Sequence, residues 1–335
     1  MDAIDMLTLV AREVDKKGNA TATAAAKPVR VCRPGVCPPE WGIIQYQPTF
    51  AGNTIYGVCF ILLLLAQLYL GIRKKTWTYM SAVCLGILGE IVGYGGRLML
   101  NNNNFDMNNF LVNLVPLTIA PALLTAGIYL CLSRVIVVVG ANHSRIKPKM
   151  YTYIFVGCDL LSLILQAIGG AMASMANGGS DADLGVNIMI AGLCSQIVSM
   201  VIFFVLWGDF ALRVRKAKNS GDVKTVHAPL YENLRAERTF HWFQLSLFAA
   251  TVLIFIRCVY RVAELWNGFD SHLANDELTF MIFEGPMIIL AVGLMTVFHP
   301  GRVFGDLWVA AGKGYRFMRH GDSGSTEKLD ANNWH

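Results

Sequence analysis

Eight charged or strongly polar side chains lie inside segments that are otherwise long apolar runs. The clearest case is the stretch 89–100, GEIVGYGGRLML, in which Glu90 and Arg97 stand seven residues apart. A charged side chain near the centre of a bilayer costs about 2.5–3.5 kcal/mol even on the lenient insertion scale, so such residues face a protein interior or a wet cavity. The set predicts a polar ligand-binding cavity rather than a catalytic centre, and its members are Glu90, Arg97, Asp159, Gln166, Arg257, Arg261, Glu264 and Glu284.

The spacing of these residues predicts three polar stripes, each on one helix face. Glu90 and Arg97 are seven residues apart, as are Asp159 and Gln166, and residues at that spacing share a face. The third stripe follows i, i+4 and i+7 spacing and consists of Arg257, Arg261 and Glu264.

Depth along the helices predicts which of these charges meet. It favours pairing of Glu90 with Arg257, and of Glu284 with Arg261 or Arg97, in a chamber that opens outward. Buried ion pairs can also lock helices in register without touching a ligand, and that reading stays open for any single residue.

The elements that position these residues follow from composition. The chain has 335 residues, of which 54% are hydrophobic and 15% charged, whereas soluble domains carry about 25% charge. A membrane-crossing helix needs about 20 apolar residues. We therefore predict an all-α polytopic membrane protein with seven transmembrane helices at 51–71, 77–99, 110–133, 151–174, 186–209, 241–264 and 278–298.

Lysine and arginine in the short loops predict the orientation of the chain. The loops after the first, third and fifth spans are basic, and those after the second, fourth and sixth have no basic residue. Because basic loops stay in the cytoplasm, we expect an extracellular tail at 1–45, a transmembrane domain at 46–305 and a cytoplasmic tail at 306–335. The net charge of +5 then serves orientation and does not indicate a nucleic-acid partner.

Two features of the first tail fit an extracellular location. Asn19 begins a glycosylation sequon, and Cys32 and Cys37 flank a Pro-Gly turn where they are candidates for a disulfide. The other six cysteines fall one in each of the first six spans, as expected of small packing residues. No pattern for a metal, a cofactor or an enzyme active site is found, and the histidines are scattered.

Several blocks of sequence, taken in order, resemble one known family. They are YQP at 46–48, GEIVGYGGR at 89–97, IAPALLTAGIYLCLSRVI at 119–136, FVGCDLLSLILQAIGG at 155–170, AGLCSQ at 191–196, RCVYRVAELWNG at 257–268 and FHPGR at 298–302. Over about 43–305 the chain resembles the fungal lipid-translocating exporters, the seven-span proteins of the resistance-to-aminocholesterol type.

The resemblance implies a plasma-membrane protein that moves amphipathic lipids such as sphingoid long-chain bases and confers resistance to toxic lipid-like compounds. The ammonium of such a base would meet Glu90, Asp159 or Glu284, while Arg257 or Arg261 would keep the empty carboxylates ionised. Two alternatives remain, a seven-helix receptor or sensor of lipid stress and a porphyrin or haem uptake protein. The sequence does not specify the oligomeric state.

Overall fold

The computed structural model describes residues 42–140, 144–175, 180–219, 231–266, 273, 275–305 and 307–312. All regular secondary structure in these residues is helical. The predicted glycosylation site at Asn19 and the candidate disulfide between Cys32 and Cys37 lie outside the described residues. The predicted division of the chain into tails and a membrane domain stays a prediction.

Within the described ranges, seven helical segments are long and apolar enough to cross a membrane, which agrees with the predicted number and indicates an integral membrane protein. The first six are α2 (Phe50–Arg73), α3 (Trp77–Asn102), α4 (Met107–Gly140), α5 (Pro148–Met175), α6 (Ser180–Asn219) and α9 (Arg238–Leu265). The seventh consists of α10 (Glu277–Phe283) and α11 (Gly285–Val297). The described part of the chain also contains short helices beside the spans, among them α8 (Glu232–Ala236) and α12 (Pro300–Val303).

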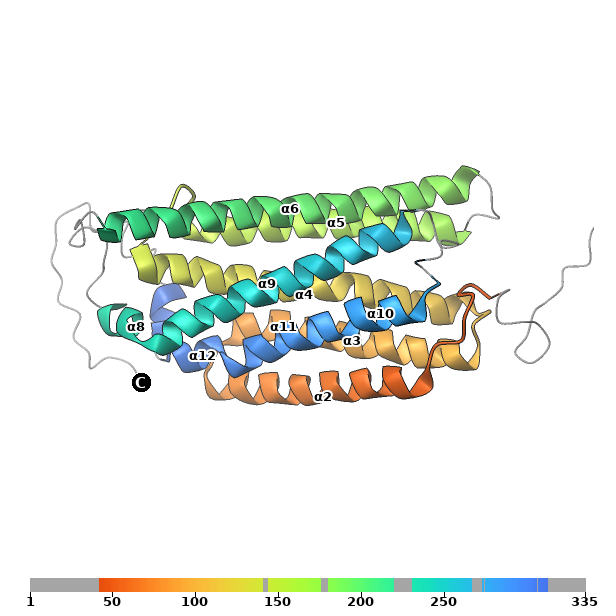
Figure 1. The fold of residues 1–335 in the computed structure, drawn as a ribbon, viewed down its shortest axis with the longest axis horizontal. Helices are drawn as coiled ribbons and strands as arrows, with labels where there is room; N and C mark the ends of the chain where they lie inside the picture. The colour runs from red at the N-terminus through yellow and green to blue at the C-terminus, as the bar shows by residue number, and fades with distance from the viewer. Residues whose placement is uncertain are drawn as a thin grey trace, which may run out of the picture. The chain divides into compact units, whose positions relative to one another are not determined.

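The spans pack as a ring in which neighbours in sequence are neighbours in space. α2 packs on α3, α3 on α4, α4 on α5, α5 on α6 and α6 on α9, and α11 closes the ring against α9 and α2. Figure 1 shows α5 and α6 side by side at one edge and α2 at the other, with α4 and α9 between them. Since α4 also touches α9, it is the most buried span, and α2 is the least buried.

Glycines allow α3 and α4 to approach closely, as expected where small residues line a helix interface in a membrane. A Cβ atom on Gly96 would lie 2.5 Å from the backbone nitrogen of Asn113, and one on Gly93 would lie 2.5 Å from Leu117. Gly95 points the other way and has no atom within 4 Å of such a Cβ. The close packing holds the face of α3 that carries Glu90 and Arg97 against the interior.

The predicted outer end of the bundle is where α3, α5 and α9 end and α2, α4, α6 and α10 begin. The segment 42–49 lies across this end and is bonded to two connections. The backbone nitrogen of Ile43 donates to the Asn104 carbonyl at 3.1 Å, and the Asn104 side chain donates to the Ile44 carbonyl at 3.3 Å. The Thr49 nitrogen donates to the Glu277 carboxylate at 2.5 Å, so the segment ties α2 to the start of α10.

The opposite end is where α6 extends past its neighbours. Arg213, Arg215 and Lys216, which we expected in the fifth loop, lie on the last turns of α6, because the helix continues to Asn219. Asp209 accepts ion pairs from Arg145 and Arg213, each at 3.0 Å. These exposed pairs link the start of α5 to α6.

Candidate functional site

A buried ion pair between α9 and the seventh span forms the centre of the candidate site. Arg257 on α9 donates to the carboxylate of Glu284, and its guanidinium also donates to the backbone carbonyl of Leu117 on α4 at 2.6 Å. Glu284 is 0% exposed and Arg257 2%. One guanidinium therefore joins three membrane spans inside the protein.

Prolines explain why both acceptors are available to Arg257. Pro121 has no backbone N–H, so the carbonyl of Leu117, four residues earlier, has no helical partner. Glu284 lies where α10 ends and α11 begins, just before Pro286. Interrupted membrane helices place charged and backbone groups around ligand sites in many transporters. The sequence thus interrupts the seventh span and removes one backbone hydrogen bond from α4 where the arginine lies.

Glu90 lies beside this ion pair but is not bonded to it. It is 0% exposed, and its charged neighbours are Arg257, Glu284 and Arg261. Neither carboxyl oxygen of Glu90 has a hydrogen-bond partner among the described residues, and the same holds for the Tyr94 hydroxyl and the second oxygen of Glu284. Buried polar atoms without partners cost about 1–3 kcal/mol each, so this region is suited to a polar ligand.

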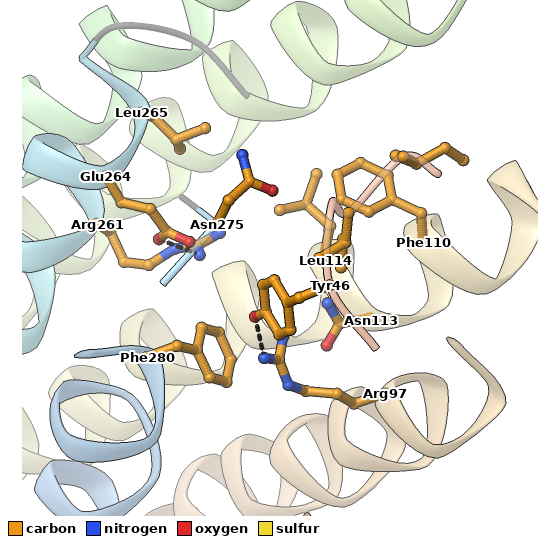
Figure 2. Close-up of a pocket in the computed structure, with 12 residues that line it drawn as sticks. Tyr46, Arg97, Phe110, Asn113, Leu114, Arg261, Glu264, Leu265, Asn275 and Phe280 are labelled. Carbon is orange, nitrogen blue, oxygen red and sulfur yellow. Dashed lines mark hydrogen bonds and ion pairs between the residues drawn. The ribbon is translucent and has the colours of Figure 1, made fainter. Parts of the chain in front are cut away.

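A second charged group lies at the predicted outer end, next to the first. Figure 2 shows Arg97 between two rings, with its guanidinium carbon 3.5 Å from the centre of the Phe280 ring and 5.6 Å from that of Tyr46. Arg97 also donates to the Tyr46 hydroxyl. Arg261 and Glu264, both on α9, pair at 2.5 Å on the far side of the same space.

A small cavity of about 40 Å³ separates these groups. Ligand pockets measure about 300–1,000 Å³, so this cavity accommodates a few water molecules and no lipid headgroup. Tyr46 closes it from the segment 42–49. Burial raises the pKa of the Tyr46 phenol, an effect that the positive charge of Arg97 partly offsets, so the phenol stays neutral at cellular pH. In this conformation Tyr46 covers the cavity at the predicted outer end.

Asp159 and Gln166 belong to a third polar group, between α4, α5 and α6. The Asp159 carboxylate accepts hydrogen bonds from Thr125 at 3.0 Å and Tyr129 at 3.1 Å, both on α4. The side-chain amide of Gln166 donates to Gln196 on α6 at 3.4 Å. These bonds join neighbouring spans and involve none of the arginines.

The three groups change the predicted arrangement of the site. Glu284 pairs with Arg257, not with Arg261 or Arg97, so that predicted pairing is wrong. Arg257 bonds Glu284 and not Glu90, because the helix break places the Glu284 carboxylate at its guanidinium. All eight predicted residues are buried, but they form three groups and do not line one open chamber.

Sequence reasoning missed the partners of these charges. Tyr46, Thr125 and Phe280 contact charged side chains, and Leu117 does so through its backbone. One signal was available for the backbone contact, since every proline in a helix frees the carbonyl four residues before it. A second was the i, i+4 pair of Thr125 and Tyr129 in an apolar span, which share a face and were available to meet Asp159.

A larger apolar groove lies between α6 and α9 and measures about 550 Å³. Most of its lining is aromatic and consists of Phe204, Trp207, Phe248 and Phe255. It has no charged lining residue and is therefore separate from the three polar groups. Among the described residues, no group of three His, Cys, Asp or Glu side chains is placed to hold a metal ion.

In the part of the chain that the structure describes, seven apolar helices around buried charged side chains define a polytopic membrane protein with a polar interior. The chain belongs to the RTA1-like family, the fungal lipid-translocating exporters, because the family model described as "RTA1 like protein" matches residues 83–306. That match covers α4, α5, α6, α9 and the seventh span, as well as most of α3.

Three proteins of Saccharomyces cerevisiae are similar to this chain. Over 255 residues the chain is 34% identical to the sphingoid long-chain base transporter RSB1 of Saccharomyces cerevisiae, an alignment that covers 70% of this chain and 66% of the relative. The chain thus spans just under two thirds of that relative's length. It is 29% identical to protein RTM1 and to protein RTA1 of the same organism, over 71% and 70% of their lengths. No solved structure matches this chain.

Proposed function

We propose that this protein moves sphingoid long-chain bases across the plasma membrane and so protects cells against toxic lipid-like compounds. A long-chain base has an ammonium group and hydroxyls at one end of a hydrocarbon chain. The observation that carries the proposal is the buried cluster of Glu90, Arg257 and Glu284, in which two acids lie near one guanidinium that is paired with only one of them. The name of the relative RSB1 adds the substrate class.

The charges of the cluster fit a cationic headgroup better than an anionic one. Arg257 is already bonded to Glu284 and Leu117, whereas Glu90 has no hydrogen-bond partner among the described residues. We therefore assign Glu90 as the first acceptor of the ammonium, with Glu284 beside it. An anionic ligand such as a porphyrin would have to displace Glu284 from Arg257.

The outer group, Arg97 with Tyr46, Arg261 and Glu264, serves as the closure of the pathway in this proposal. Its cavity is too small for a headgroup, so the segment 42–49 must move for a base to pass. Asp159 and Gln166 hold α4, α5 and α6 together beside the pathway. We place the N-terminus outside the cell and the C-terminus in the cytoplasm, as the basic loops predict.

Flip of a fluorescent phytosphingosine in liposomes that contain only this purified protein tests the proposal. We expect wild-type protein to move the base between leaflets, and Glu90→Ala and Arg257→Ala to reduce the rate by more than tenfold while remaining monodisperse. Asp209→Asn, which alters an exposed ion pair at the other end of the bundle, is the matched control and should keep the wild-type rate.

The same measurement separates transport from sensing. A lipid-stress receptor would bind the base without moving it between leaflets. If the base moves between leaflets no faster in liposomes with wild-type protein than in protein-free liposomes, the proposed function is contradicted. Growth on phytosphingosine of fungal cells that lack the protein, with and without the same variants, relates the liposome rates to resistance.

A further inference from the structure

The Glu90 carboxyl is the one acid of the central cluster whose charge the structure leaves uncompensated. Arg257 lies near both Glu90 and Glu284, yet its side-chain ion pair is with Glu284. Both oxygens of Glu90 lack a hydrogen-bond partner among the described residues, at a position with no exposed surface. An ionised carboxylate in such a place is far more costly than a neutral carboxylic acid.

The surroundings of Glu90 on every packed helix agree with this assignment. α4 contributes the carbonyl of Leu117, which Arg257 already occupies. α2 contributes Tyr56, whose hydroxyl donates to the Met281 carbonyl at 2.9 Å and whose ring contacts Tyr94. The titratable groups that face Glu90 from its own helix, from α9 and from the break in the seventh span are Tyr94, Arg257, Arg261 and Glu284.

We propose that Glu90 is a proton-exchange site, and that binding of a cationic long-chain base expels one proton from it. This inference rests on the proposed function and extends it to the coupling of transport. In the empty protein, Arg257 compensates Glu284, and Glu90 carries a proton. When the ammonium arrives, the O–H bond of the Glu90 carboxyl breaks, the proton leaves to water, and the carboxylate pairs with the ammonium.

Charge balance makes this exchange the less costly route. One positive charge enters the cluster and one leaves as a proton, so the net charge inside the membrane domain stays the same. The protein can bind a proton again once the base has left. A proton moving one way then accompanies a base moving the other way, which gives the chain a source of energy without nucleotide hydrolysis.

Competition between the two acids for Arg257 gives the proposal a second consequence. If Glu284 is made neutral by Glu284→Gln, Arg257 becomes available to Glu90. The Glu90 carboxyl should then be ionised before any ligand arrives, and ligand binding should release no proton. Removal of an acid other than Glu90 would thus abolish proton release from Glu90.

Calorimetric titration of the full-length protein in detergent tests the proposal. The probe is N,N,N-trimethylsphingosine, whose fixed positive charge cannot exchange a proton, so any released proton comes from the protein. Titrations near neutral pH in buffers with different enthalpies of ionisation give the number of protons released, corrected by titration into protein-free micelles. We expect about one proton per bound molecule for wild type, and about none for Glu90→Gln and Glu284→Gln.

Asp159→Asn is the matched comparison, since it neutralises another buried acid that already accepts bonds from Thr125 and Tyr129. It should retain the wild-type proton release. If Glu284→Gln does not yield folded protein, the difference in proton release between Glu90→Gln and Asp159→Asn is sufficient to test the proposal. Binding without proton release in wild type, or unchanged release in Glu90→Gln, would overturn the inference while leaving the proposed function intact. A wild-type protein that binds no base would instead contradict the proposed function.

Discussion

Arg257 on the sixth span donates a hydrogen bond to the backbone carbonyl of Leu117, 140 residues earlier in the chain, at 2.6 Å. Pro121 leaves that carbonyl without a helical partner. Pro121 in α4 and the charge of Arg257 on α9 are therefore parts of one arrangement, and a change at either residue should affect the other.

Pro121→Ala tests this link. The new N–H at position 121 is expected to bond the Leu117 carbonyl and take an acceptor away from Arg257. We expect flip of phytosphingosine to fall several-fold, with no loss of thermal stability, because removing a proline from a helix interior relieves about 3 kcal/mol of strain. Pro116→Ala, on the same helix, is the control and should keep more activity; equal rates for the two variants would argue against the link.

The ion pair between Arg257 and Glu284 should respond differently to single and double substitution. Arg257→Met leaves the buried Glu284 carboxylate unpaired and is expected to cost about 3–5 kcal/mol in the free energy of unfolding. The double variant Arg257→Met/Glu284→Met removes both charges and should recover most of that loss, yet remain inactive in flip assays. Thermal unfolding in detergent measures the stability of the single and double variants. Recovery of transport in the double variant would show that the ion pair is not needed for transport.

Tyr129 is expected to support stability rather than transport. Tyr129→Phe removes one of two hydrogen-bond donors to the Asp159 carboxylate, which should cost about 1–3 kcal/mol in stability. The rate of flip per folded molecule should not change. Tyr153→Phe is the matched control, since Tyr153 is on α5 and exposed; a change in the transport rate of Tyr129→Phe would bring Asp159 into the substrate path.

A cross-link should test whether the segment 42–49 closes the predicted outer end. Ile44 and Asn104 are in contact, so the double variant Ile44→Cys/Asn104→Cys is expected to form a disulfide under mild oxidation. The oxidised protein should lose most of its transport, and a reducing agent should restore it. Each single cysteine variant is the control, and full activity of the cross-linked protein would show that bases pass without movement of this segment.

Two adjacent glycines offer a matched test of helix packing. A Cβ atom on Gly96 would meet the Asn113 backbone at 2.5 Å, while one on Gly95 would meet nothing within 4 Å. Gly96→Ala should therefore force α3 away from α4 and cost about 1–3 kcal/mol. Gly95→Ala should be neutral or slightly stabilising. Thermal unfolding of both variants decides this, and similar melting temperatures would contradict the close approach.

The fold could be predicted largely because the bilayer imposes a simple rule. About twenty apolar residues are needed per span. The first six predicted spans each fall within one helix, and the seventh covers α10 and α11 with the break between them. The predicted ends differ most from the helix ends at α4, by seven residues, and at α6, by ten. The C-terminal extension of α6 was missed because its last turns are basic and polar. The length of an apolar run predicts only the part of a helix that lies inside the membrane.

The members of the site could be predicted, but not their partners. Buried charge is expensive anywhere along an apolar span, so Glu90, Arg257 and Glu284 stood out from type and position alone. Which arginine meets Glu284 depends on helix order and rotation around the ring, and a single sequence contains neither. The basic loops predict the orientation of the chain, which stays a prediction.

α6 is 40 residues long, about 60 Å at the rise of an α-helix, and a bilayer's oily layer is only about 30 Å thick. Its last turns therefore stand in the headgroup layer or beyond it, with Asp209 clamped by Arg145 and Arg213 near that boundary. On whichever side of the membrane this end lies, lipid phosphates would bind the basic side chains of these turns, Arg213, Arg215 and Lys216. This end of α6 would then be anchored at the membrane surface. In the proposed transport, the rest of the bundle would move about that fixed end.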